Sequence, residues 1–173
     1  MLKDMEIRPL EKTDLPLRVQ WMNHPKVFRS MHFQLPVLLE NTEKWYASIL
    51  QNENRFDCVF VLDNKVVAMG GLTNRNPSNN KAELYIFVDP DAQKSGLGTQ
   101  ATRLLCRYGF TVLHLEKIYL ITNEDNLPAQ KVYAKCGFVL EGKLRNEYLN
   151  EEGKYLSRFY YGLLKKEWNE QIG

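Results

Sequence analysis

The hydrophobic pattern of the chain changes its period once, near residue 90, and this change constrains the fold more than any other feature. Upstream, three apolar stretches rich in β-branched residues follow one another, at 56–62, 65–72 and 81–88. Asp63-Asn64 is a two-residue hairpin turn between the first two, so the stretches predict an antiparallel meander. Downstream, apolar residues recur at helical spacing from Leu97 to Val112, which predicts a long helix with one buried face.

Shorter elements complete the pattern on both sides of this change. Residues 5–10 predict a strand, which Pro9 places at a sheet edge, and two helices are expected before residue 56, over about 14–23 and about 41–51. A polar loop is expected at 73–80, a strand at 117–122, a helix at 127–135 between Asn126 and Gly137, and two long strands within 138–164. The economical arrangement is an α/β fold: a single mixed, largely antiparallel sheet flanked by helices, in the order β-α-α-β-β-β-α-β-α-β-β.

Composition excludes several classes of protein. The 173 residues, 44% of them hydrophobic, suffice for one domain over 1–173. The 23 basic and 21 acidic residues are interspersed, which argues against nucleic-acid binding, and no apolar run approaches the roughly 20 residues of a membrane span. Residues 1–14 lack the apolar stretch of a signal peptide. We therefore expect a cytoplasmic protein with no nucleic-acid or membrane partner.

The sulfur and imidazole side chains give no metal or disulfide signal. The three cysteines, Cys58, Cys106 and Cys136, are widely spaced and odd in number, which predicts buried free thiols in a reducing compartment. The three histidines lack metal-ligand spacing, so no metal is expected.

The segment between the third strand of the meander and the long helix has the chemistry of an anion site. Pro90 ends the strand, and Gly96 and Gly98 open the helix. The first N–H groups of a helix lack intrahelical partners, and glycine lets the backbone approach a ligand. The segment therefore suits a pyrophosphate, with Lys94 at its rim. A tight turn into the helix explains the two glycines equally well, so both interpretations stay open on this evidence.

Two nucleotide-binding motifs fit this segment poorly. The Gly-Lys-Ser/Thr ending of a P-loop is absent. Gly96-x-Gly98-x-x-Ala101 satisfies the loose dinucleotide pattern, but that pattern needs its glycines directly after the strand of a repeated βαβ fold. A dinucleotide-dependent oxidoreductase is therefore the less favoured alternative.

Two signatures resemble the GNAT superfamily of N-acetyltransferases. Gln93-x-x-Gly96-x-Gly98 is similar to the family's acyl-coenzyme A loop, and Asn126-Leu-Pro-Ala129-Gln-Lys-Val-Tyr133-Ala-Lys-Cys-Gly137-Phe138 is similar to its second signature. From Lys81 onward the chain looks closest to spermidine and ribosomal-protein N-terminal acetyltransferases, and Trp21-x-Asn23-x-Pro25 is similar to amino-sugar N-acetyltransferases.

The resemblance implies an acetyl-CoA-dependent enzyme that moves an acetyl group directly to a primary amine. The acceptor would be a small molecule, such as an amino sugar or a polyamine, or a peptide N-terminus. A non-catalytic acetyl-CoA sensor is the alternative. The end of strand 81–88 would splay from its neighbour and expose backbone groups to the pantetheine arm. The cofactor-binding residues so implied are Phe87, Val88, Gln93, Lys94, Ser95, Gly96, Leu97, Gly98, Thr99, Asn126 and Ala129.

Tyr133 and Glu83 are the catalytic candidates. The resemblance implies that Tyr133 protonates the departing thiolate; a core tyrosine with a satisfied hydroxyl is the alternative. Glu83 would take the proton of the amine, through a water, although a carboxylate at this point of a strand also suits a solvated face. Glu147 is a second acceptor-side candidate, or a solvated hairpin residue. Cys136 is expected to be a structural thiol and not an acyl-enzyme nucleophile.

Charge along residues 24–41 bears on the acceptor. Polyamine enzymes of this branch hold a polycation with acidic residues, whereas this segment carries four basic residues, His24, Lys26, Arg29 and His32, against Glu40 alone. This pattern predicts a preference for neutral or anionic amine carriers over spermidine. Exposed edges of such a sheet often pair, which leaves a homo-oligomer open.

Overall fold

The computed structural model describes residues 4–92 and 95–168. Within these residues seven strands form one sheet in the order β1-β2-β3-β4-β5-β7-β6. The strands are β1 (Glu6–Pro9), β2 (Phe56–Leu62), β3 (Lys65–Asn76), β4 (Lys81–Val88), β5 (Lys117–Asn123), β6 (Val139–Leu149) and β7 (Tyr155–Leu164). Neighbouring strands are antiparallel except β4 and β5, which run parallel. The predicted mixed, largely antiparallel sheet is confirmed.

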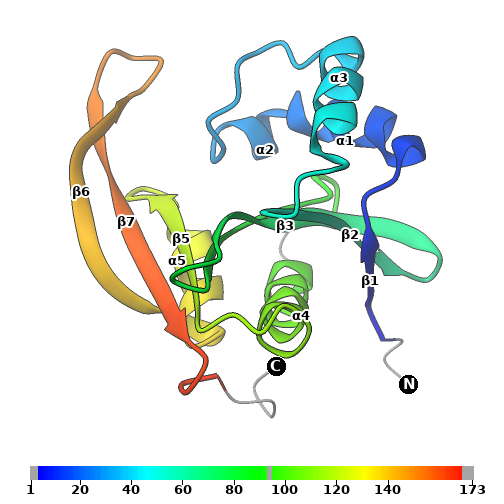
Figure 1. Ribbon diagram of the computed structural model, residues 1–173. Coiled ribbons are helices and arrows are strands. Elements are labelled where there is room, and N and C mark those ends of the chain that lie inside the picture. Colours follow the sequence, from blue (N-terminus) through cyan, green and yellow to red (C-terminus); the bar gives the residue numbers. More distant parts are fainter. Residues whose placement is uncertain (1–3, 93–94, 169–173) are drawn as a thin grey trace.

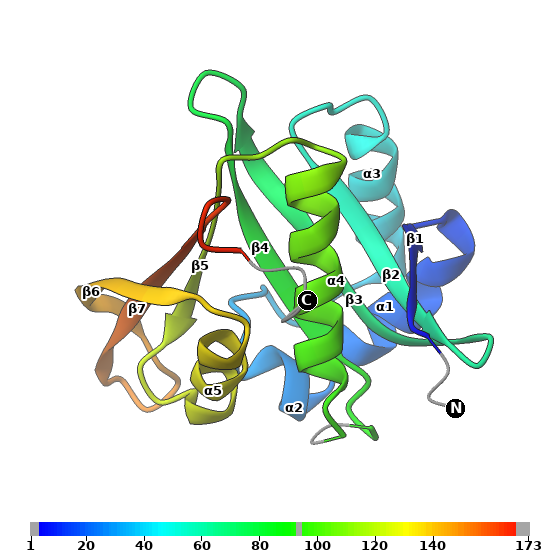
Figure 2. The same cartoon turned by 90° about the horizontal axis from the view of Figure 1, so that it is seen from below.

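Helices cover both faces of this sheet (Figure 1). They are α1 (Leu15–Met22), α2 (Pro25–Phe28), α3 (Leu39–Ile49), α4 (Leu97–Thr111) and α5 (Leu127–Lys135), with a short 3-10 helix, η1, at Lys12–Asp14. α1, α2 and α3 lie on one face, and α4 runs along the other face beside α5 (Figure 2). No described helix is both long and apolar enough to cross a membrane.

Each face of the sheet has its own apolar cluster, because alternate residues of a strand point to opposite sides. Ala82 and Leu84 of β4 join the cluster under α4 together with Leu105 and Phe110. Phe87 of β4 belongs instead to the cluster under α1 and α3, with Trp21, Val59 and Met69. Odd-numbered residues of β4, including Glu83, therefore share the face that carries α1–α3.

Most predicted elements are confirmed, several to the residue, and three differ. The two helices expected before β2 are three α-helices, because Pro25 both ends the first run and opens α2, for which the His24 ring nitrogen Nδ1 accepts the Lys26 N–H at 3.1 Å. The helix expected over about 41–51 runs from Leu39 to Ile49. The loop expected at 73–80 is shorter, because β3 continues past an irregularity in pairing to Asn76.

Candidate active site

Strands β4 and β5 separate part-way along their length. They are paired at Lys81↔Lys117, Ala82↔Ile118 and Glu83↔Tyr119. Beyond Glu83, β4 continues beside β3 to Val88, while β5 continues beside β7 to Asn123. We call the facing backbone edges of residues 84–88 and 120–123 the wedge. The splaying that the family resemblance implies is therefore present in the structure.

Strand alternation decides which groups of β4 face the wedge. The Asp89 N–H donates to the Val67 carbonyl at 3.0 Å, in register with the pairs Val88↔Ala68 and Phe87↔Met69. Asp89, and with it Phe87, thus directs its backbone groups toward β3, and Ile86 and Val88 direct theirs to the wedge. Backbone groups of both Phe87 and Val88 were predicted to face the pantetheine arm. In this register the backbone groups of Val88 face the wedge, and those of Phe87 do not. Phe87 is instead a core side chain, 5% exposed.

The N-terminus of α4 lies beside the end of β4. Gly96 has φ +80°, a left-handed conformation that favours glycine. The Gln100 N–H donates to the Gly96 carbonyl at 3.1 Å, so the N–H groups of residues 97–99 precede the first helical bond. A Cβ at Gly98 would lie 3.7 Å from Cγ2 of Val88 and 4.0 Å from Cγ2 of Val132. These N–H groups therefore lie next to the wedge without an intrahelical acceptor, as the predicted anion site requires.

Of the remaining loop predictions, Gln93 and Lys94 lie outside the described residues. Ser95 is exposed, and its hydroxyl donates to the Ala92 carbonyl, which closes the turn before α4. The Leu97 side chain is buried, so only its backbone is available to an anion, and Thr99 is partly buried.

Tyr133 lies on α5, on the α4 side of the sheet. Its ring packs against Phe138 and Tyr161, with centroids 5.8 and 6.2 Å away. Among the described residues its hydroxyl has no hydrogen-bond partner, and it is not fully enclosed by protein atoms. Burial, with a smaller contribution from the neighbouring thiols of Cys136 and Cys106, raises the pKa of Tyr133 to about 12. The side chain is thus a protonated phenol without a partner in the described part of the chain, unlike a satisfied core tyrosine.

The ends of α5 are built as the sequence predicts. The Asn126 side-chain oxygen accepts the Ala129 N–H at 3.3 Å, and Gly137 has φ +87° just beyond the helix. This cap occupies the backbone donor of Ala129 and leaves the amide nitrogen of Asn126 without a partner in the described chain. Asn126 therefore caps the helix and still presents two N–H donors.

Cys136 follows α5, and its thiol points to the Thr99 carbonyl at 3.8 Å. Burial raises the pKa of Cys136 to about 11, against the opposing effect of Arg103. The thiolate needed for an acyl-enzyme is therefore scarce near neutral pH. This chemistry favours direct transfer and a structural role for Cys136.

Glu83 lies on the opposite face from Tyr133, at the point where β4 and β5 part. The Asn74 amide donates to its carboxylate at 2.7 Å. Next to it, Tyr119 and Tyr160 stack with centroids 5.1 Å apart and ring planes at 6°. Burial raises the pKa of both tyrosines, and the charge of Glu83 contributes to each shift. Glu83 and the tyrosine pair thus form an acidic, aromatic wall beside the wedge.

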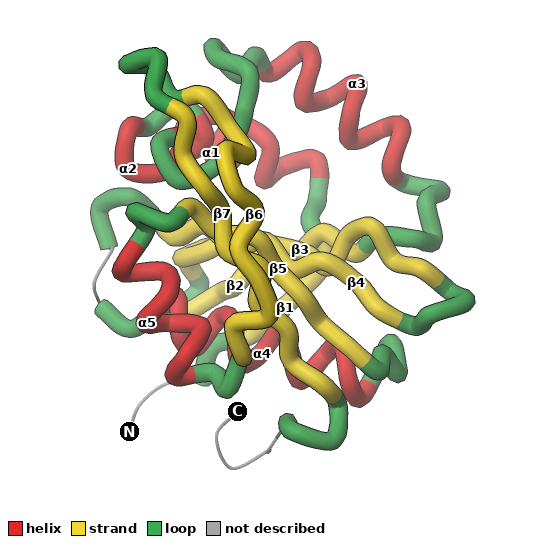
Figure 3. The backbone as a smooth tube through the Cα atoms, turned by 90° about the vertical axis from the view of Figure 1, so that its left-hand side faces the viewer, coloured by secondary structure: helices red, strands yellow, loops and turns green. Residues whose placement is uncertain are grey.

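The segment between α2 and α3 completes this wall. His32 packs edge-on against Tyr148 at 4.5 Å, and its Nε2 lies 2.9 Å from the side-chain oxygen of Asn123. The β6–β7 hairpin rises toward α2 to make this contact (Figures 1 and 3). The sequence indicated only the charge of His32, and neither Asn123 nor Tyr148 carried a local signal. Glu147 lies in the irregular part of β6 and is exposed.

Two of the four basic residues in this segment serve the fold. His24 caps α2, as described above, and the Lys26 ammonium donates to the Pro90 carbonyl at 3.1 Å. Linear charge along residues 24–41 is therefore a weak guide to the acceptor.

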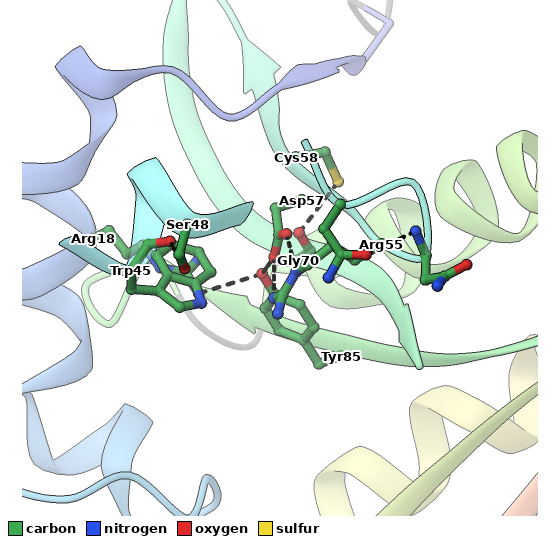
Figure 4. Close-up of polar contacts among 10 residues, drawn as sticks. Arg18, Trp45, Ser48, Arg55, Asp57, Cys58, Gly70 and Tyr85 are labelled. Carbon is green, nitrogen blue, oxygen red and sulfur yellow. Dashed lines mark hydrogen bonds and ion pairs between the residues drawn. The ribbon is translucent and has the colours of Figure 1, made fainter. Parts of the chain in front are cut away.

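A polar network joins α1 and α3 to the sheet (Figure 4). Arg18 is 6% exposed and lies 4.7 Å from the centroid of the Trp45 ring. It donates to the Tyr85 hydroxyl at 3.3 Å, Tyr85 donates to Asp57, and Arg55 pairs with Asp57 at 2.6 Å. These residues come from four separate segments, so sequence reasoning could not assemble them. Their contacts fix the helical layer that borders the acceptor face.

A sheet that opens beside the N-terminus of a crossover helix, with Tyr133 on one face and Glu83 on the other, is the arrangement that the resemblance to N-acetyltransferases implies. The family model described as an acetyltransferase (GNAT) domain matches residues 4–139, and the chain belongs to this family. Acetyl-CoA is therefore the acetyl donor.

Relatives place the chain within the family. It is 36% identical over 147 residues to the spermidine N(1)-acetyltransferase of Escherichia coli, covering 83% of this chain and 77% of the relative. It is 31% identical over 132 residues to a putative ribosomal N-acetyltransferase of Bacillus subtilis, covering 76% and 69%. The crystal structure of spermidine N-acetyltransferase from Vibrio cholerae in complex with CoA and spermine matches with a TM-score of 0.90 at 24% identity, over 95% of this chain and 97% of that one. This likeness confirms the fold.

Proposed function

We propose that the enzyme holds acetyl-CoA along the wedge and transfers its acetyl group directly to a small primary amine. The observation that carries the proposal is that β4–β5 pairing ends at Glu83, and that the edge of β4 left free beyond it runs to Val88, beside the open N-terminus of α4. The pantetheine arm adds to the free edge of β4 through backbone groups of Val88 and Ile86. The pyrophosphate takes the N–H groups of residues 97–99, with Asn126 and Ala129 lining the other side. The family resemblance implies that Gln93 and Lys94, outside the described residues, also contribute.

One proton transfer takes place on each face of the sheet. On the acceptor face Glu83, through a water, takes a proton from the ammonium, and the free amine attacks the thioester carbonyl. The carbon–sulfur bond breaks, and Tyr133 on the other face donates its proton to the departing sulfur. The nitrogen releases its remaining extra proton to solvent as the amide forms, and solvent returns a proton to the tyrosinate. The unpartnered hydroxyl of Tyr133 and its raised pKa support this role, because the group is protonated and has no competing acceptor.

The acceptor is a small aliphatic amine. The name of the Escherichia coli relative, spermidine N(1)-acetyltransferase, supports an amine of this kind. The wall of Glu83, Tyr119 and Tyr160 supports it independently, since a carboxylate and aromatic faces attract an ammonium group.

The test measures free thiol released from acetyl-CoA with spermidine, amino sugars and short peptides as acceptors. We expect release with at least one amine, and a loss of about 100-fold or more in kcat/KM for Glu83→Gln. Glu116→Gln, which removes an exposed carboxylate paired with Lys165, serves as the charge control and should leave the rate unchanged. Thermal stabilisation by acetyl-CoA without thiol release from any amine would indicate a sensor, and stabilisation by NAD would favour the oxidoreductase alternative.

A further inference from the structure

Arg158 of β7 brings a cation to the wedge on the acceptor face. It stands opposite Asn123 of β5 in the register, so the two side chains share the face that carries Glu83. Its Nη2 donates to the Ile121 carbonyl at 3.2 Å. The Lys165 N–H donates to the Glu116 carbonyl in the same register, so the backbone groups of even-numbered residues of β5 point to β7. The backbone groups of odd-numbered residues point the other way, and the Ile121 carbonyl therefore faces the wedge.

The guanidinium keeps unused donors at this position. Its Nε is buried and has no hydrogen-bond partner among the described residues. Its Nη1 makes no hydrogen bond with them either and is not enclosed, so it is open to a ligand. No described carboxylate forms an ion pair with Arg158. A half-buried cation with free donors and no anionic partner is costly unless a ligand supplies the anion.

The surroundings of Arg158 contain both signs of charge. Burial lowers the pKa of Arg158, and the charges of Glu83 and Glu147 oppose that shift, so both carboxylates are close enough to act on it. Arg158 therefore sits within reach of the carboxylate that accepts the ammonium proton. A second ammonium on the acceptor would meet this guanidinium, whereas an anionic group would be attracted to it.

We propose that Arg158 is a specificity-determining residue that binds an anionic group, carboxylate or phosphate, on the molecule whose primary amine is acetylated. The planar guanidinium fork suits both groups, because each offers two oxygens to adjacent N–H donors. The acceptor is then an amine with a negative charge close by, and not a polycation. This inference rests on the proposed function, in which Glu83 receives the amine.

The test compares matched acceptors that differ only in the anion. Glucosamine 6-phosphate is set against glucosamine for the phosphate, and β-alanine against β-alaninamide for the carboxylate, with spermidine as the polycation. The variants are Arg158→Gln, Arg158→Lys and Arg158→Glu. Arg145→Gln, which removes an exposed cation of the neighbouring strand β6, is the control.

We expect the wild type to favour the anionic member of at least one pair, and the favoured pair identifies the source of the anion. Arg158→Gln should lower kcat/KM for that member by about 10- to 100-fold, the range for a charge-assisted hydrogen bond, and leave the neutral member within about threefold. Arg158→Lys should recover part of the loss, Arg158→Glu should raise kcat/KM for spermidine, and Arg145→Gln should change none of these values.

Equal kcat/KM for both members of each pair, or a wild-type preference for spermidine over all four, overturns the inference. An equal loss for both members in Arg158→Gln also overturns it and makes Arg158 a structural residue. In these cases Glu83-dependent thiol release would leave the proposed function intact. Thermal stabilisation by glucosamine 6-phosphate or β-alanine that is lost in Arg158→Gln supports the assignment of Arg158, even if no amine is acetylated. The absence of acetylation with every amine would refute the proposed function but not the anion site at Arg158.

Discussion

Replacing Tyr133 by Phe separates the catalytic from the structural role of the tyrosine. The ring contacts with Phe138 and Tyr161 remain, and the hydroxyl has no partner among the described residues whose hydrogen bond would be lost. We therefore expect the melting temperature to stay within about 2 °C of wild type, since a shift of several degrees needs about 1 kcal/mol. By contrast, kcat should fall by about 100-fold or more, the range for general acid catalysis.

The size of the expected fall in kcat depends on how closely the pKa of the Tyr133 phenol matches that of the sulfur that it protonates. With a pKa of about 12, Tyr133 would be a poor donor to a thiolate of pKa about 8.5, the value of a thiol in water. The same buried environment raises the pKa of the neighbouring Cys136 to about 11. A coenzyme sulfur desolvated to the same degree would lie within about one pKa unit of Tyr133, which makes the transfer nearly balanced.

The assay is steady-state thiol release from pH 6.5 to 9.5, with the melting temperature measured on the same preparation. Because its pKa is raised, Tyr133 stays protonated throughout this range, and the loss in Tyr133→Phe should be the same at every pH. Affinity for acetyl-CoA should be unchanged. Turnover within about threefold of wild type across the range would refute the acid role, and a large fall in melting temperature would show a hydrogen bond that the structure lacks.

Substitutions at three further positions test other parts of the molecule. Gly98→Asp should abolish thermal stabilisation by acetyl-CoA, because it places an anion in the proposed pyrophosphate site. Gly98→Ala should keep this stabilisation, because the added Cβ would lie 3.7 Å from its nearest neighbour. Binding of acetyl-CoA by Gly98→Asp with wild-type affinity would show that the site is misplaced. Glu83→Gln should lower kcat/KM for the amine by about 100-fold or more at every pH from 6.5 to 9.5, and a value within about threefold of wild type would exclude Glu83 as the base. Burial opposes ionisation of Asp14, yet hydrogen bonds from Arg8 and the Glu11 N–H lower its pKa below the ordinary value. Asp14→Asn should therefore cost about 1 to 2 kcal/mol of unfolding free energy at pH 7. The difference should begin to shrink below about pH 4, the ordinary pKa of an aspartate, and disappear only below the lowered pKa of folded Asp14, so urea titrations should show a smaller difference at pH 3 than at pH 7.

Elements with strong local signals could be predicted from the sequence to the residue. β2, β4 and α5 are of this kind, because their ends are marked by a hairpin turn, a proline, and Asn126 with Gly137. α2 was missed because a proline can either follow the end of one helix or stand in the first turn of the next. At Pro25 both apply, and only the cap by the His24 side chain reveals the second helix. The boundary of β3 was wrong because its last residues pair with β4 across an irregularity that no pattern reveals.

The site was predictable only where it follows a contiguous signature. Gly96, Gly98, Asn126 and Tyr133 belong to such signatures, and the structure places them around the wedge. The direction of backbone groups in β4 depends on the register with β3, which is why the backbone groups of Ile86, and not those of Phe87, face the wedge. Contacts that join distant segments have no local signal at all.

The single parallel pair explains why the donor and acceptor sites coincide. Two adjacent parallel strands need a crossover connection, and here α4 supplies it between β4 and β5. A crossover helix starts at the C-terminal end of the first strand, so the anion-binding terminus of α4 must lie beside Val88. The strands part at this same end, because β5 follows β7 while β4 follows β3. In the proposed mechanism the thioester thus reaches the opening from the α4 side and the α1–α3 side is left for the amine, so direct transfer would need both substrates to be bound together.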